Sequence, residues 1–112
     1  MKISIIIPVK PGGEVAAVAA LRGLTPASPP FEVIVAEGRR PSCQRNRAAA
    51  EATGDILYFL DDDSCTVPDA LERIERHMQD STVAAVGGPS LTPADNNPFQ
   101  RAVAWALASV FG

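Results

Sequence analysis

Two hydrophobic patterns alternate along the chain. Short continuous apolar runs, which are typical of strands buried on both faces of a sheet, lie at residues 3–9, 31–36, 56–60 and 82–86. Segments with apolar residues at helical spacing lie at 14–24, 41–53, after Pro68 and at 99–111. The order strand, helix, strand, helix, strand, helix, strand predicts an α/β fold: a Rossmann-like, mostly parallel sheet with helices on both faces.

The bulk properties fit one small intracellular domain. The 112 residues allow a single domain, and the formal charge of −3 favours no particular class of partner. Cys43 and Cys65 form neither a disulfide framework nor a metal-ligand spacing, which indicates a reducing compartment. The apolar run before Pro8 is too short for a signal peptide or a membrane span. We therefore expect a cytoplasmic location, with peripheral attachment to the inner face of the membrane as the alternative.

Chemically active residue types gather where the predicted strands end. Ligands of open parallel sheets bind outside the carboxyl ends of the strands. Those ends lie at residues 8–10, 36–40, 61–63 and 87–89, and they supply basic, acidic and glycine positions. The sequence therefore predicts a ligand site along this edge of the sheet.

Three consecutive aspartates, Asp61, Asp62 and Asp63, follow directly on an apolar strand. Like charges this close repel each other unless a cation or a ligand relieves them. Oxygen ligands of this kind suit Mg²⁺ or Mn²⁺, which complete their shell with water and substrate phosphates. A solvated acidic loop before the helix after Pro68 is the alternative, and we favour the metal site.

Glu37 and a group of arginines surround the second predicted strand end. Glu37 can accept hydrogen bonds from a nucleobase or a ribose, or it can be an ordinary loop acid. Four of the ten basic residues, Arg39, Arg40, Arg45 and Arg47, lie close together, and guanidinium groups suit phosphate recognition. For Arg40 and Arg47 we favour a solvated helix face. The only histidine, His77, lies in a charged helical segment away from every strand end, so we expect no catalytic role for it.

An ordered set of motifs resembles the family 2 glycosyltransferases of the GT-A type. The matching stretches are "ISIIIPVK", "FEVIVAEG" and "QRNRAAAEATGDILYFLDDD", followed by "PDALERI" and "VGGP". The family pattern is an Arg-Asn pair in a helix, then A-x-G-[DE], then an apolar strand that leads into D-x-D. Arg45-Asn46, residues 52–55 and residues 61–63 occupy those places, and the resemblance covers nearly the whole chain.

The resemblance implies inverting transfer of a sugar from a nucleotide-diphosphate donor to a hydroxyl of a glycan, a lipid or a small molecule, and no nucleic-acid partner. It places the nucleoside pocket at Pro8, Val9, Lys10 and Glu37, with Arg45 near the base. Asp61 and Asp62 would approach ribose or phosphate, and Asp63 with Asp61 would hold Mg²⁺ or Mn²⁺. The family's second strand commonly ends in Asp, and the acid of its first turn comes earlier than Glu14. The resemblance therefore defines the identity of the nucleobase less well than the class of enzyme.

The family takes its general base from a later acidic motif, and no such motif precedes Gly112. We therefore expect residues 1–112 to be the N-terminal nucleotide-sugar-binding half of a longer enzyme, inactive by itself, with its catalytic base elsewhere. A non-catalytic nucleotide-binding or interaction module of the same fold is the alternative. The apolar stripe of the predicted helix at 99–111 suggests a homo-oligomer formed through that helix.

Overall fold

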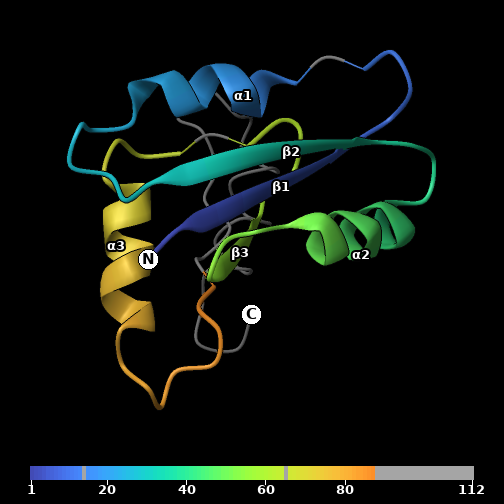
Figure 1. Ribbon diagram of the computed structural model, residues 1–112. Coiled ribbons are helices and arrows are strands. Elements are labelled where there is room, and N and C mark those ends of the chain that lie inside the picture. The colour runs from blue at the N-terminus through green and yellow to red at the C-terminus, as the bar shows by residue number, and fades with distance from the viewer. Residues whose placement is uncertain (14, 65, 88–112) are drawn as a thin grey trace, which may run out of the picture.

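Within the residues that the structure describes, the chain forms a three-stranded parallel sheet with the strand order β2-β1-β3 (Figure 1). The structure is a computed structural model, and it describes residues 1–13, 15–64 and 66–87. The strands are β1 (Ile3–Val9), β2 (Phe31–Glu37) and β3 (Ile56–Phe59). The helices are α1 (Ala16–Ala20), which continues into the 3₁₀ turn η1 (Leu21–Gly23), α2 (Pro41–Glu51) and α3 (Ala70–Met78). The α/β class with a parallel sheet is confirmed.

β1 is the centre of the fold, and all seven of its residues are buried. Its odd-numbered residues, such as Ile5, face a core that α1 and α3 complete with Ala17 and Leu71. Alternate residues of a strand point to opposite faces, so the fully buried Ile6 lies on the other face, where α2 packs against β1 and β2. Because helices cover both of its faces, β1 is a continuous apolar run rather than an alternating one.

β2 and β3 lie on either side of β1 at the edges of the described part of the sheet, and both are more exposed than the sequence predicts. β2 alternates between half-buried and exposed residues, and Phe31, Val33 and Val35 are exposed. On β3, Leu57 and Phe59 are exposed as well. β-branched and aromatic composition therefore predicted these strands correctly, whereas it did not predict which of them lies in the middle.

The predicted fourth strand at residues 82–86 is wrong, because the described part of this segment has no strand. The carboxylate of Asp80 accepts hydrogen bonds from the backbone N–H and the hydroxyl of Thr82, at 2.9 and 2.6 Å, and this closes a turn. The segment contains Ala84 and Ala85, which have low strand propensity. The predicted helix at 99–111 and association through it lie outside the described residues. No helix in the described ranges is long and apolar enough to cross a bilayer.

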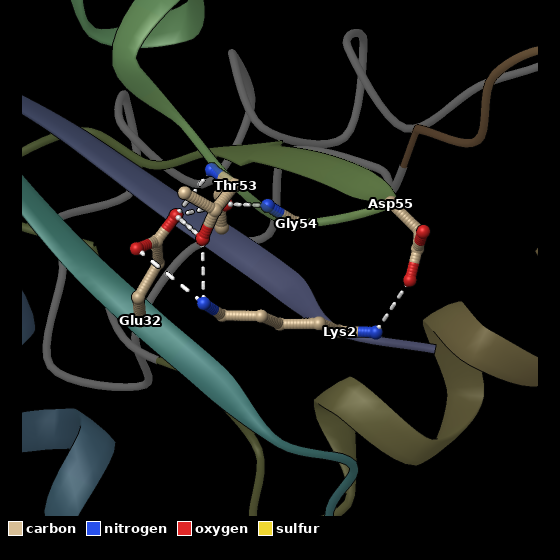
Figure 2. A network of polar contacts seen from close by, with 6 residues as sticks. Lys2, Glu32, Thr53, Gly54 and Asp55 are labelled. Atoms are coloured by element: carbon tan, nitrogen blue, oxygen red, sulfur yellow. Dashed lines mark hydrogen bonds and ion pairs between the residues drawn. The ribbon is translucent and has the colours of Figure 1, made fainter.

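A polar network joins the strands at the amino end of the sheet, opposite to the strand ends that the sequence singled out (Figure 2). One carboxylate oxygen of Glu32, on β2, accepts the Ser4 hydroxyl at 2.6 Å and the Thr53 backbone N–H at 2.7 Å. Lys2 Nζ lies 3.7 Å from the other oxygen. These donors, with the Ser4 hydroxyl as the largest cause, lower the pKa of Glu32 from 4.5 to about 2. The network fixes β2 and the start of β3 against β1.

Gly54 completes this network. Its backbone N–H donates to the Ser4 hydroxyl oxygen at 2.8 Å. A Cβ atom at position 54 would lie only 2.5 Å from that oxygen and 2.7 Å from the Ser4 backbone nitrogen. The sequence predicted a helical segment through residue 53, but α2 ends at Glu51. Gly54 is required because β3 enters the sheet in close contact with β1.

Candidate functional site

A cavity of about 340 Å³ lies at the carboxyl end of the sheet, on the edge that the sequence predicts. The connection after β1 leads to α1 on one face of the sheet, and the connection after β2 leads to α2 on the other (Figure 1). Neighbouring connections that diverge in this way leave a crevice between the strand ends. The lining residues are Pro8, Val9, Lys10, Gly38, Arg39, Pro41, Gln44, Arg45, Asp61, Asp62 and Asp63.

The cavity gathers most of the predicted site residues, although they come from three separate segments. Residues 8–10 lie at the end of β1, Arg45 lies on α2, and residues 61–63 follow β3. Arg39 also lines it, whereas Arg40 and Arg47, for which a solvated face was favoured, do not. Both signs of charge therefore meet in one cavity wall. This arrangement suits a ligand that carries negative charge and binds together with a cation.

Glu37 is the one predicted binding residue that is not among the lining residues. Its carboxylate accepts a hydrogen bond of 2.9 Å from the backbone N–H of Gly12. Gly12 has a φ of 71°, a left-handed conformation that favours glycine, in the turn directly after β1. Gly13 closes the same turn by donating to the Lys10 carbonyl at 2.9 Å. Glu37 thus ties the turn after β1 to the end of β2, next to the cavity.

The aspartate tract is held by its backbone, which leaves the side chains near solvent. The carbonyl of Asp62 accepts the N–H of Ala17, on α1, at 3.0 Å, and the carbonyl of Asp61 accepts the N–H of Ser64 at 3.1 Å. Asp61 and Asp63 are exposed, and Asp62 is half-buried. Solvation of the exposed carboxylates and the nearby guanidinium of Arg45, 3.5 Å from Asp61, relieve their mutual repulsion.

The carboxylates fit a divalent cation only in part. Within the described ranges, no three acidic, cysteine or histidine side chains converge into a ready-made metal site. Mg²⁺ needs less than this from the protein, because one or two carboxylates suffice when substrate phosphates and water supply the other ligands. Asp61 and Asp63, exposed at the cavity wall, have the right chemistry for that partial role.

Gln44 is a site residue that the sequence analysis missed. It is only 7% exposed, and its Nε2 donates to two backbone carbonyls, those of Val9 at 3.1 Å and Ala36 at 2.6 Å. One amide group thus joins the ends of β1 and β2. A Cβ atom on Gly38 would lie 2.9 Å from the side-chain carbonyl carbon of Gln44, so Gly38 gives the amide its space. The available signal was a polar residue four positions before Ala48, on the buried side of α2.

No curated protein and no solved structure gives a significant match to the chain. A family model described as "Glycosyl transferase family 2" matches residues 5–109. The matched region contains the carboxyl ends of all three strands and every residue that lines the cavity. The chain therefore belongs to glycosyl transferase family 2.

Proposed function

We propose that this cavity binds the nucleoside diphosphate part of a nucleotide sugar, together with Mg²⁺ or Mn²⁺. Residues 1–112 would then form the donor-binding part of a glycosyltransferase that transfers the sugar to an acceptor hydroxyl with inversion. The observation that carries the proposal is the meeting of Asp61 and Asp63 with Lys10 and Arg45 around one cavity at the diverging strand ends of a family 2 chain.

The strand order gives the cavity two chemically different sides. β3, which ends in the aspartates, lies on one side of β1, and β2 lies on the other. A diphosphate with its cation suits the acidic side, at Asp61 and Asp63. The nucleoside would then extend across residues 8–10 toward Gly38 and Gln44. The bound cation would supply neutralisation of the charge that develops on the departing diphosphate.

The basic side chains have a separate task in this proposal. Lys10, Arg39 and Arg45 share the cavity wall and offer hydrogen-bond donors to phosphate or to the base. Arg45 already lies within 3.5 Å of Asp61, so its guanidinium is held at the acidic side without a ligand. Because this side chain is already positioned, it loses less conformational freedom when the ligand binds.

Calorimetric titration with UDP and GDP, each with and without Mn²⁺, tests the proposal. We expect binding that weakens at least tenfold when Mn²⁺ is replaced by EDTA, and a similar loss in Asp63→Asn. Glu51→Gln is the matched control, because it removes one exposed acidic charge outside the cavity. The proposal would be contradicted if the chain bound neither nucleotide. It would also be contradicted if the affinity stayed the same without Mn²⁺ and in Asp63→Asn.

A further inference from the structure

The side-chain amide of Gln44 has a fixed orientation. Its Nε2 donates to the carbonyls of Val9 and Ala36. Rotating the amide by half a turn would place Oε1 against these two carbonyl oxygens, which are acceptors as well. The two backbone carbonyls therefore fix the direction in which Gln44 Oε1 points.

Gln44 Oε1 has no hydrogen-bond partner in the described part of the chain, and it is shielded from solvent. A buried acceptor without a donor is destabilising, and it is uncommon in folded proteins unless a water, an ion or a ligand supplies the donor. Gln44 as a whole is more than nine-tenths buried and belongs to the cavity wall. The orphan oxygen is therefore an acceptor that a donor group of a bound ligand can satisfy.

The neighbours of Gln44 leave room for such a donor. Gly38 lies against the amide, and a Cβ atom there would be 3.1 Å from Oε1. Arg39 and Arg45, the long side chains of the same wall, are exposed and half-buried, respectively. Exposed side chains change rotamer within nanoseconds, so a ligand can displace the side chain of Arg39 and reach the oxygen.

The place of Gln44 in the sheet limits which part of a ligand it meets. Its amide bridges the ends of β1 and β2, whereas the aspartates follow β3 on the opposite side of β1. A nucleoside diphosphate whose phosphates lie at the aspartates directs its base and ribose toward Gln44. The amide oxygen is neutral, so it suits a neutral N–H or O–H donor.

We infer that Gln44 Oε1 accepts a hydrogen bond from the nucleoside of the bound nucleotide and thereby helps to select that nucleotide. The donor is either the ring N–H of a base such as uracil or guanine, or a ribose hydroxyl. This inference rests on the proposed function, and it adds a residue that selects between nucleosides. A site with a buried, preset acceptor discriminates against analogues that lack the matching donor.

Pairs of nucleotides that differ by one donor test the inference. With Mn²⁺ present, calorimetry compares UDP with 3-methyl-UDP and 2′-deoxy-UDP, and GDP with 1-methyl-GDP and 2′-deoxy-GDP. For the wild-type chain, we expect one of the two modifications to weaken binding about tenfold, which identifies the donor as base or ribose. In Gln44→Met, the ratio of the affinity for the unmodified nucleotide to the affinity for the modified one should fall toward one.

The ratio separates selection from a merely structural role. If Gln44 only joined the ends of β1 and β2, Gln44→Met would weaken every nucleotide by the same factor and leave the ratio unchanged, and this would overturn the inference. Gly38→Ala is the second variant, because it crowds the amide while Gln44 itself stays, and the ratio should fall there too. Gln79→Met, on an exposed residue next to α3, is the matched control.

The two proposals fail in distinguishable ways. Wild-type chain that binds UDP or GDP but tolerates both modifications without loss overturns only the role of Gln44. Wild-type chain that binds none of these nucleotides overturns the proposed function and this inference with it. Thermal unfolding of each variant, measured alongside the titrations, shows whether a variant with a lower affinity ratio is still folded.

Discussion

The guanidinium of Arg45, on α2, lies 3.5 Å from a carboxylate oxygen of Asp61, which follows β3. The pair connects two segments of the cavity wall that are sixteen residues apart in the chain. The side chain of Asp61 is 72% exposed and that of Arg45 37%. Solvent and salt screen an exposed pair of this kind, so its direct contribution to stability is small.

Arg45→Ala should therefore weaken ligand binding far more than folding. We expect the free energy of unfolding to fall by less than about 1 kcal/mol. Affinity for UDP or GDP with Mn²⁺ should fall about tenfold or more, because hydrogen bonds to charged groups contribute roughly 1.5–3 kcal/mol. Urea unfolding and calorimetry measure the two effects. Arg47→Ala, on the same helix but outside the cavity, should change neither, and a steep stability loss in Arg45→Ala with intact affinity would refute this role.

Gly54→Ala should destabilise the fold without touching the cavity. The new Cβ would meet the Ser4 hydroxyl oxygen at 2.5 Å and the Lys2 carbonyl oxygen at 2.9 Å, both in or next to the central strand. Overpacking against a rigid strand costs about 1–3 kcal/mol. The matched control is Gly23→Ala, since a Cβ atom at Gly23 would have no neighbour within 4 Å. Equal stability of the two variants in urea would show that β3 can move away from β1 freely.

The sequence predicted the parts of the fold that depend on local pattern. β1 has the predicted bounds because the continuous run from Ile3 to Val9 reflects burial on both faces. The edge position of β2 was not predictable from Phe31, Val33 and Val35, because strand order depends on pairing between distant segments. The false strand at 82–86 arose from an apolar pattern that the turn at Asp80 interrupts.

The sequence predicted which residues line the cavity better than it predicted the contacts that these residues make. Residues 8–10 and 61–63 follow the rule that ligands bind at the carboxyl ends of strands, and they line the cavity together with Arg45 of α2. The contact of Glu37 with Gly12 joins positions 25 residues apart and has no local signature. Gln44 was missed because a glutamine within a helix usually faces solvent, and only the three-dimensional structure places it under the strand ends.

Glu37 should affect nucleotide binding through the turn after β1. Because it accepts the Gly12 N–H and does not line the cavity, its effect depends on keeping an acceptor at that place. Glu37→Gln keeps a carbonyl oxygen and should retain most of the affinity for UDP or GDP. Glu37→Ala removes the acceptor, and we expect several-fold weaker binding with a stability loss of about 1 kcal/mol. Glutamine and alanine variants that bind equally weakly would instead mean that the charged carboxylate contacts the ligand.

The hydrogen bonds to Glu32 should make stability depend on acid pH. They hold its pKa at about 2 in the folded chain, against 4.5 for the ordinary group, so the folded state favours the charged carboxylate. A depressed pKa of this kind stabilises the fold fully above pH 4.5, and the contribution disappears as pH falls toward 2. Wild-type chain should therefore be more stable than Glu32→Gln at pH 7, and this difference should shrink between pH 4.5 and 2. Urea unfolding at a series of pH values measures it, with Glu51→Gln as the control that should follow the wild type throughout. A difference that stayed constant down to pH 2 would mean that Ser4 and Thr53 hold a neutral side chain at position 32 as well as a charged one, and that the network stabilises the strands by its geometry alone.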